Sequence, residues 1–352
     1  MSASDYHAPR LIDYELGEKI ASGGSCDVFV ATHKLTKSTV AIKCICKRQA
    51  RKHNITLEID ALRNLRHANI ITLYQVEEYH DYTYLVLSYH SAGNLWGYLK
   101  KRWLIIGENT GLLEKEVRAL FTQIVGAVSH LHESGYAHRD IKLGNIVLDE
   151  SLTVKLADFG FAEKQSRYDK RSTKDNCGTR EYFAPELLGS ASINLQKTDM
   201  WSLGVVLYTL LTGRKPFKAD GKDDRQFQLS LLRSSYTKPD HLSPQACSVL
   251  DQLLHVIPSK RCTCKQLLEH PWFEEEANYH PKEMAINKYR LDKECTRQMA
   301  HHYGIPQKQM ISMVREWKYD QHTATYLLLL EERIEQKEEM SERDSGTCCV
   351  IS

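Results

Sequence analysis

Four short segments of the chain stand out, and the first three carry residue types that could transfer a phosphoryl group. They are VAIK at 40–43, HRDIKLGN at 138–145, DFG at 158–160 and APE at 184–186, in that order. The transition state of phosphoryl transfer spreads charge over the phosphate oxygens, so its catalyst consists mainly of positioned cations and metal ligands. A lysine, two loops centred on aspartate and a turn that contains Gly23 supply such groups here. The sequence therefore predicts a phosphoryl-transfer site built from distant parts of the chain.

An acidic residue on the apolar side of a helix adds to this prediction. Residues 55–66 have helical spacing, and their apolar stripe includes Leu62 and Leu65. Glu58 shares that side of the helix, because it precedes these two leucines by four and seven positions. A carboxylate that points inward needs a cation, so we expect a basic partner for Glu58.

The elements that must position these residues change in kind along the chain. Residues 14–46 alternate apolar and polar around turn clusters, which predicts a small antiparallel sheet. Residues 114–133 carry a clear apolar stripe and residues 200–211 are apolar on all sides, which predicts two core helices. Apolar runs at 146–148 and 154–156, separated by turn residues, predict a hairpin. The order is a sheet-rich first part followed by a helix-rich second part, an α+β arrangement.

The composition narrows the class of protein. The 352 residues allow about two domains, and 47 Lys and Arg against 45 Asp and Glu leave a net charge of +2, so no general field favours nucleic acid or anionic lipid. Ten cysteines are scattered without a CxxC pair, which favours reduced thiols over a zinc or disulfide framework. The sequence opens without an apolar leader, and no run approaches the roughly 18 apolar residues of a membrane span. We therefore expect a cytoplasmic protein whose membrane contact, if any, is local.

The four segments, in this order, resemble the signature set of eukaryotic protein kinases. The resemblance covers 14–273 and includes DMWSLGVVLYTLLTG at 199–213 and Arg261 before LLEHPWF, a style similar to the calcium/calmodulin-dependent group. It implies the bilobal kinase fold, with a small β-rich N-lobe and a helical C-lobe. Lys142 after Asp140, with Thr179 in CGTREYFAPE, is similar to the serine/threonine pattern. The implied activity is transfer of the ATP γ-phosphate to Ser or Thr of a protein.

The resemblance also implies roles for single residues. Lys43 would contact the α- and β-phosphates of ATP and pair with Glu58. Lys43 would thus be the cation that the inward-pointing carboxylate needs. The alternative is that the two residues form an ordinary ion pair with no role in nucleotide binding. Further residues of the implied nucleotide site are Ile20, Gly23, Val28, Ala41, Leu87 at the gatekeeper position and Tyr89 at the hinge.

The implied catalytic groups lie in the two aspartate-centred loops. Asp140 would accept the proton of the substrate hydroxyl, and Lys142 would neutralise the transferred phosphoryl. Asn145 and Asp158 would hold magnesium. A simple turn at Asp158 is the alternative.

The C-terminal part resembles a second known module. Residues 299–332 are similar to the ubiquitin-associated domain that follows the kinase domain in the AMP-activated-kinase-related branch, and within that branch the chain most resembles the sperm motility kinases. Because this module usually regulates the kinase there, we expect it to contact the kinase domain within the chain; an unrelated three-helix bundle is the alternative. The predicted organisation is an N-terminal segment, a kinase domain, a linker, a ubiquitin-associated-like domain of three helices and a flexible tail, at 1–13, 14–273, 274–288, 289–333 and 334–352.

Two departures from the family pattern bear on ATP and on activation. Of the glycine-rich loop only Gly23 remains, with Ala21 and Cys26 at the other glycine positions, so a pseudokinase scaffold with weak nucleotide affinity stays open as an alternative. A buried, inert Cys26 is expected. Asp175 stands where the branch carries a phosphorylatable Thr, and we hypothesise that it replaces the phosphate and attracts Arg139. The alternative is a solvated Asp175, and Ser172 and Thr173 remain candidate phosphosites.

Three further features stand out: two positions that bear on the substrate, one long stretch and the C-terminus. The acidic positions with which many basophilic kinases hold a substrate arginine are Asn94 and Gly144 here, which predicts no strong demand for that arginine. Residues 102–111, between the helix after the hinge and the long helix at 114–133, form a stretch several residues longer than is usual in the kinase family. The last four residues, CVIS, fit a prenylation box at Cys349, with Cys348 as a candidate palmitoylation site; an accidental match is the alternative. With the C-terminal module, this box leaves a third functional class open, a membrane-tethered interaction module.

Overall fold

The protein divides into two compact units. The first unit combines 1–52, 72–89 and 285–352, and the second combines 53–71 and 90–284. The computed structural model describes residues 11–24, 26–50, 52–164, 178–188, 193–217, 224–233, 236–276, 279 and 286–346.

The first unit is built on a five-stranded antiparallel sheet with strand order β1-β2-β3-β5-β4. Lys43 on β3 lies opposite Val28 on β2 and Leu85 on β5. The antiparallel sheet expected from the alternation over 14–46 is confirmed by the first three strands. The strands are β1 (Tyr14–Ser22), β2 (Cys26–His33), β3 (Thr39–Cys46), β4 (Leu73–Tyr79) and β5 (Tyr82–Ser88).

Three helices follow the sheet in the same unit, α8 (Lys293–Tyr303), α9 (Gln307–Arg315) and α10 (Gln321–Gly346). Asp292 caps α8 by accepting from the backbone N–H groups of Glu294 and Cys295, and Gly304 ends it in the left-handed conformation. The expected three-helix module is confirmed. The expectation of a flexible tail from residue 334 is wrong up to Gly346, because α10 continues through Glu, Lys, Gln and Arg, which are good helix formers.

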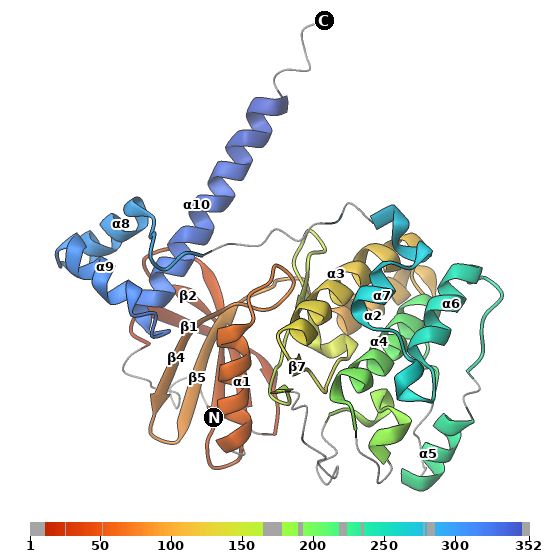
Figure 1. Ribbon diagram of the computed structural model, residues 1–352. Coiled ribbons are helices and arrows are strands. Elements are labelled where there is room, and N and C mark those ends of the chain that lie inside the picture. Colours follow the sequence, from red (N-terminus) through yellow and green to blue (C-terminus); the bar gives the residue numbers. More distant parts are fainter. Residues whose placement is uncertain are drawn as a thin grey trace, which may run out of the picture. The chain divides into compact units, whose positions relative to one another are not determined.

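One face of the sheet is covered by α10 (Figure 1). Ala324, Leu327 and Leu328 of this helix share one buried apolar cluster with the sheet. Burial of such a face is the main source of stability for a sheet with one apolar side. The sheet residues of the cluster are Tyr14, Phe29, Ala31, Val40, Ile42, Cys44, Tyr74, Tyr84 and Val86.

Polar contacts fix the position of α10 on the sheet. The Tyr74 hydroxyl donates to Glu331 Oε2 at 2.6 Å, and the backbone N–H of Val76 donates to the Tyr319 carbonyl at 2.8 Å. His33 Nε2 lies 3.2 Å from the Thr325 hydroxyl, and burial lowers the pKa of His33 to about 4, so the ring is neutral near pH 7. The expected contact between the C-terminal module and the kinase domain is present.

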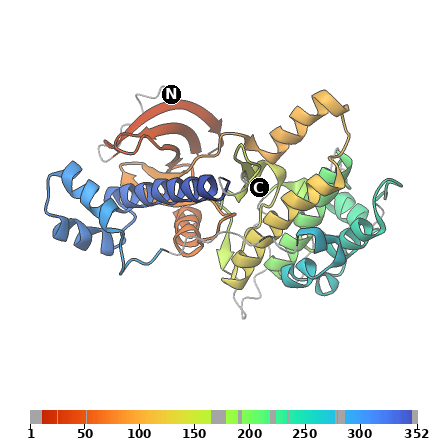
Figure 2. The ribbon, with the colours of Figure 1, turned by 90° about the horizontal axis from the view of Figure 1, so that it is seen from above.

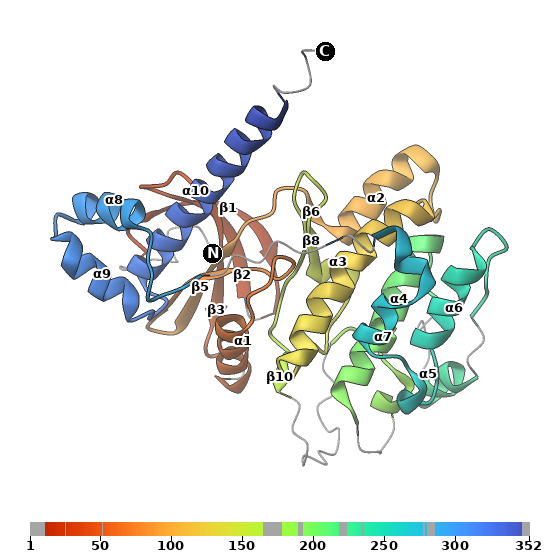
Figure 3. The ribbon, with the colours of Figure 1, turned by 45° about the horizontal axis from the view of Figure 1, so that its top comes forward.

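The second unit is mainly helical. In Figure 3, α3 and α4 lie side by side inside it. The core helices expected at 114–133 and 200–211 are confirmed as α3 and α4, and β8 pairs with β9 as the expected hairpin. Its elements are α1 (Lys52–Asn64), β6 (Gly93–Asn94), α2 (Leu95–Ile106), α3 (Glu114–Glu133), β7 (Tyr136–Ala137), β8 (Ile146–Leu148), β9 (Val154–Leu156), β10 (Glu163–Lys164), α4 (Leu195–Thr212), α5 (Asp224–Leu232), α6 (Pro244–Leu253) and α7 (Cys264–Leu268).

Among the described residues, no helix combines the length and the apolar character needed to span a lipid bilayer.

The packing of α10 on the sheet makes a stability prediction. Leu327→Ala removes a side chain with no solvent exposure from the cluster between helix and sheet, so we expect the free energy of unfolding to fall by about 2–5 kcal/mol. Leu104→Ala is the matched control, because its side chain is 88% exposed, and should cost less than about 0.5 kcal/mol. Urea titration followed by circular dichroism measures both. Equal stability of the two variants would contradict the packing.

Candidate active site

The Asp140 carboxylate is buried at the centre of a hydrogen-bond network in the second unit. Its Oδ2 accepts from Lys142 Nζ at 2.7 Å and from Asn145 Nδ2 at 2.9 Å. Its Oδ1 accepts from the backbone N–H of Thr179 at 2.9 Å and from the Thr179 hydroxyl at 3.0 Å. Lys142 Nζ also donates to that hydroxyl at 2.9 Å. The structure thus brings together four of the residues predicted for the site, and both oxygens of Asp140 are held in place.

A second buried carboxylate, Asp199 on α4, fixes the loop that carries Asp140. The backbone N–H groups of His138 and Arg139 donate to its two oxygens at 2.8 and 2.9 Å, and His132 Nε2 lies 2.9 Å from Oδ2. Arg139 has a positive φ of 69°, a conformation that a bulky residue rarely adopts without such contacts. Asp199 therefore holds the backbone turn immediately before Asp140.

The predicted magnesium ligands are Asn145, at the end of this loop, and Asp158 of the DFG segment. Asn145 Nδ2 also donates to the Asp140 carbonyl at 2.9 Å, so the amide oxygen of Asn145 points away from Asp140. Asp158 has a positive φ of 61°, and the His138 ring packs on Phe159 with centroids 4.9 Å apart. An amide oxygen and a carboxylate are hard donors of the kind that Mg²⁺ prefers, so the residues fit that ion.

The Glu58 side chain is buried on α1, as expected from its position on the apolar stripe. A Cβ on Gly160 would lie 3.4 Å from Asp158 Oδ1 and 3.7 Å from Glu58 Oε2, so both carboxylates approach this glycine. Lys43 is buried on β3 of the first unit. Because Lys43 and Glu58 belong to different units, their pairing stays a prediction.

Gly178 brings Thr179 up to the loop that carries Asp140. It has a φ of +102°, and a Cβ there would lie 2.7 Å from the Arg139 carbonyl oxygen and 3.3 Å from Asp140 Oδ1. Only glycine fits both the conformation and the close approach. The Arg139 side chain forms an ion pair with Glu163 on β10.

The remaining residues predicted for the nucleotide site belong to the first unit, where Ile20, Val28, Ala41 and Leu87 lie on strands and Gly23 and Tyr89 directly follow strands. Ala41 and Leu87 are buried, Val28 and Tyr89 are partly buried, and Ile20 is exposed. The backbone N–H of Gly23 donates to the Cys26 carbonyl at 2.8 Å, which closes the turn between β1 and β2.

The two replaced glycines of this turn are ordinary strand residues. Ala21 lies on β1 without a positive φ, and Cys26 is the first residue of β2. The backbone conformation therefore does not require glycine at either position. Cys26 is only partly buried, so the expectation of a buried cysteine is wrong: it is the first residue of β2, where the side chains are partly exposed.

The APE segment is anchored by a buried arginine. Arg261 NH1 and NH2 donate to the two carboxylate oxygens of Glu186 at 2.7 and 2.8 Å, and the guanidinium lies 5.0 Å from the Trp201 ring centre. Paired, hydrogen-bonded and stacked, this buried charge is fully compensated.

Sequence reasoning missed the structural roles of Asp199, His132 and Glu163. Asp199 stood within a quoted motif, and the argument applied to Glu58 could have found it, since a carboxylate at the start of an apolar helix also needs donors.

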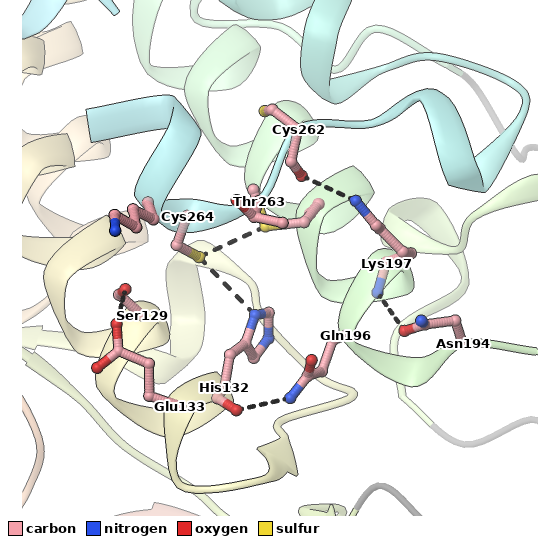
Figure 4. Close-up of a pocket in the computed structure, with 11 residues that line it drawn as sticks. Ser129, His132, Glu133, Asn194, Gln196, Lys197, Cys262, Thr263 and Cys264 are labelled. Carbon is pink, nitrogen blue, oxygen red and sulfur yellow. Dashed lines mark hydrogen bonds between the residues drawn. The ribbon is translucent and has the colours of Figure 1, made fainter. Parts of the chain in front are cut away.

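A surface pocket of about 220 Å³ lies between α3, α4 and α7 (Figure 4). His132, which holds Asp199, forms part of its wall, and its Nδ1 lies 3.8 Å from Cys264 Sγ. Burial raises the pKa of Cys262 to about 11 and that of Cys264 further, so both thiols are protonated near pH 7. The pocket therefore offers no reactive thiolate, and His132 joins its wall to Asp199.

Asp175, Ser172, Thr173, Cys348 and Cys349 lie outside the described residues. Their predicted regulatory and lipid-carrying roles stay predictions.

Comparisons with known proteins agree with this geometry. A protein kinase domain model matches residues 14–273, and the model of the UBA domain of maternal embryonic leucine zipper kinase matches residues 291–333. The maternal embryonic leucine zipper kinase of Danio rerio is 37% identical over 332 residues, which cover 93% of this chain and 47% of the relative. The one of Xenopus laevis is 36% identical over 336 residues, 94% of this chain and 50% of the relative.

The chain thus spans about half the length of these relatives, which lie in the AMP-activated-kinase-related branch that the motifs predicted. The closer likeness to sperm motility kinases stays a prediction. With a β-rich lobe, a helical lobe and a ubiquitin-associated domain after them, the chain belongs to the protein kinase family.

Proposed function

We propose that this chain is a serine/threonine protein kinase that transfers the γ-phosphate of ATP to protein substrates with the help of Mg²⁺. The observation that carries the proposal is the network around Asp140, in which Lys142, Asn145 and Thr179 hold both carboxylate oxygens. A protein that used this fold only as a scaffold would have no need to aim a buried carboxylate in this way.

The chain's own residues divide the work of the reaction. Asp140 takes the proton of the acceptor hydroxyl, and Lys142, 2.7 Å from that carboxylate, supplies positive charge where the transferred group passes. Thr179, bound to both, sets the entrance for a Ser or Thr hydroxyl. Asn145 and Asp158 would hold magnesium, which when bound neutralises charge on the phosphates. Lys43 would bind the α- and β-phosphates of the nucleotide.

Two other functional classes remain as alternatives. A pseudokinase scaffold is favoured only by the reduced glycine loop, and the ordinary backbone at Ala21 and Cys26 weakens that argument. A membrane-tethered interaction module is compatible with either class. The cytoplasm stays our proposed location, supported by the seven free cysteines among the described residues.

The test of this function is phosphate transfer from Mg-ATP to a generic protein substrate. Asp140→Asn keeps the size of the side chain but cannot accept the proton, so kcat should fall at least about 100-fold. Asp240→Asn, at an exposed position, is the matched control and should keep full activity. Transfer of radiolabelled phosphate by the purified wild-type protein and the two variants measures the three activities.

A silent wild-type protein would contradict the proposal if Mg-ATP also failed to raise its melting temperature, because a ligand of the folded state must stabilise it. That result would favour the scaffold.

We also propose that the kinase is active without phosphorylation of its activation loop. Arg139 already pairs with Glu163, but its guanidinium carries enough donors for a second carboxylate, which Asp175 would supply. Asp175→Asn should lower kcat/KM roughly fivefold, since a partly exposed ion pair is worth on the order of 1 kcal/mol. Asp175→Glu, which keeps the charge, should stay close to wild type. Initial rates on protein shown by mass spectrometry to be unphosphorylated measure this, and unchanged rates for Asp175→Asn would refute it.

The substrate preference follows from Asn94 and Gly144. Asn94 Oδ1 accepts from the Gly97 backbone N–H at 2.9 Å and so caps α2, and neither residue offers a charge to a substrate arginine. In a peptide library, Arg three residues before the acceptor should raise the rate less than about threefold. Asn94→Asp keeps the cap and adds a carboxylate, so it should increase that preference about fivefold. An Arg after the acceptor is the control peptide, and a wild-type profile dominated by the earlier Arg would contradict the prediction.

A further inference from the structure

The end of α2 presents large apolar side chains to solvent. Leu104 is 88% exposed and Ile105 is 75% exposed, and Leu113, which precedes α3, is 73% exposed. In Figure 2 this helix, drawn in orange, runs out to the edge of the helical unit. These residues belong to or adjoin the stretch 102–111 that is longer than usual for the family. We call residues 100–113 the α2 tip.

The tip is held outward by a well-packed loop. Trp103 Nε1 donates to the Thr110 carbonyl at 2.9 Å, and the backbone N–H of Leu112 donates to the Leu210 carbonyl at 2.8 Å. A Cβ on Gly111 would lie 1.9 Å from the Leu211 carbonyl oxygen, so the loop rests directly on the end of α4. The contacts of this loop therefore fix the end of α2 in a position where Leu104 and Ile105 face solvent.

Basic and aromatic residues surround the apolar end. Lys100, Lys101 and Lys115 are exposed, and Lys100 Nζ lies 5.1 Å from the centre of the Trp96 ring. The Trp96 and Trp103 rings meet edge to face, with centroids 5.5 Å apart.

The acidic residues near the tip compensate little of this charge. Glu116 is occupied by the Tyr98 hydroxyl and lies 3.6 Å from Arg102, and Glu114 accepts from Ser243 and Trp272. Glu108 is the exposed carboxylate of the loop. Exposed charge at the tip is thus mainly positive.

We propose that the α2 tip inserts its apolar end into the headgroup region of an anionic lipid bilayer. Exposed aliphatic side chains beside tryptophan and lysine are the composition that binds such an interface, where the apolar groups leave water and the lysines meet anionic headgroups. A protein partner is less well matched, because lysine is depleted from the buried centre of protein interfaces. Protruding side chains also need no shaped partner to enter a bilayer.

Sedimentation with lipid vesicles tests the proposal. The full chain, made in bacteria so that no lipid is attached, should bind vesicles of 70% phosphatidylcholine and 30% phosphatidylserine and bind pure phosphatidylcholine far less. Leu104→Ser with Ile105→Ser should lower the partition coefficient at least about tenfold, and Lys100→Gln with Lys101→Gln roughly tenfold. The matched control is Leu229→Ser with Leu232→Ser on α5, where both side chains are 47% exposed, and it should bind like wild type.

Two results would overturn the proposal. The first is that the wild-type chain does not bind the vesicles, or that the tip variants bind them as well as wild type does and have the same melting temperature. The other is a dimer in size-exclusion chromatography that the Leu104→Ser and Ile105→Ser changes dissociate, since the tip would then be an interface between two copies of the chain.

Discussion

A single buried carboxylate sets the position of the loop that carries Asp140. Asp199 accepts from two consecutive backbone N–H groups, those of His138 and Arg139, and from the His132 ring. A buried charge must be compensated, so any movement of the loop away from α4 leaves Asp199 without its donors. Asp140 follows directly and inherits this restraint. The network of Lys142, Asn145 and Thr179 can therefore organise around a fixed point.

Much of the fold and the site could be predicted from the sequence, because the signals were local. The apolar stripe at 114–133 gave both ends of α3, and the position of Glu58 on its stripe gave its burial. The four kinase segments grouped Asp140, Lys142, Asn145 and Thr179, which contact one another in the structure. Spacing and residue type were sufficient here, since each short segment folds with its chemistry already in order.

What the sequence did not reveal depends on contacts between distant segments. The role of Asp199 requires knowing that α4 passes beneath the loop at 138–140. The length of α10 was underestimated because its last part has no apolar stripe and is supported by helix propensity alone. The stretch 102–111 had no interpretation until Gly111 was found against Leu211, which makes the tip a fixed surface.

The packing of α10 on the sheet also affects how the chain is made. The strand residues Phe29, Ile42 and Tyr84 leave the ribosome long before Ala324 and Leu327, which cover them. At roughly 5–20 residues per second, the ribosome needs on the order of tens of seconds to add the intervening chain. During that time the nascent sheet carries an uncovered apolar face, which is a binding site for molecular chaperones. This lobe therefore completes its packing only after α10 has been made, and until then its apolar face stays open to other molecules.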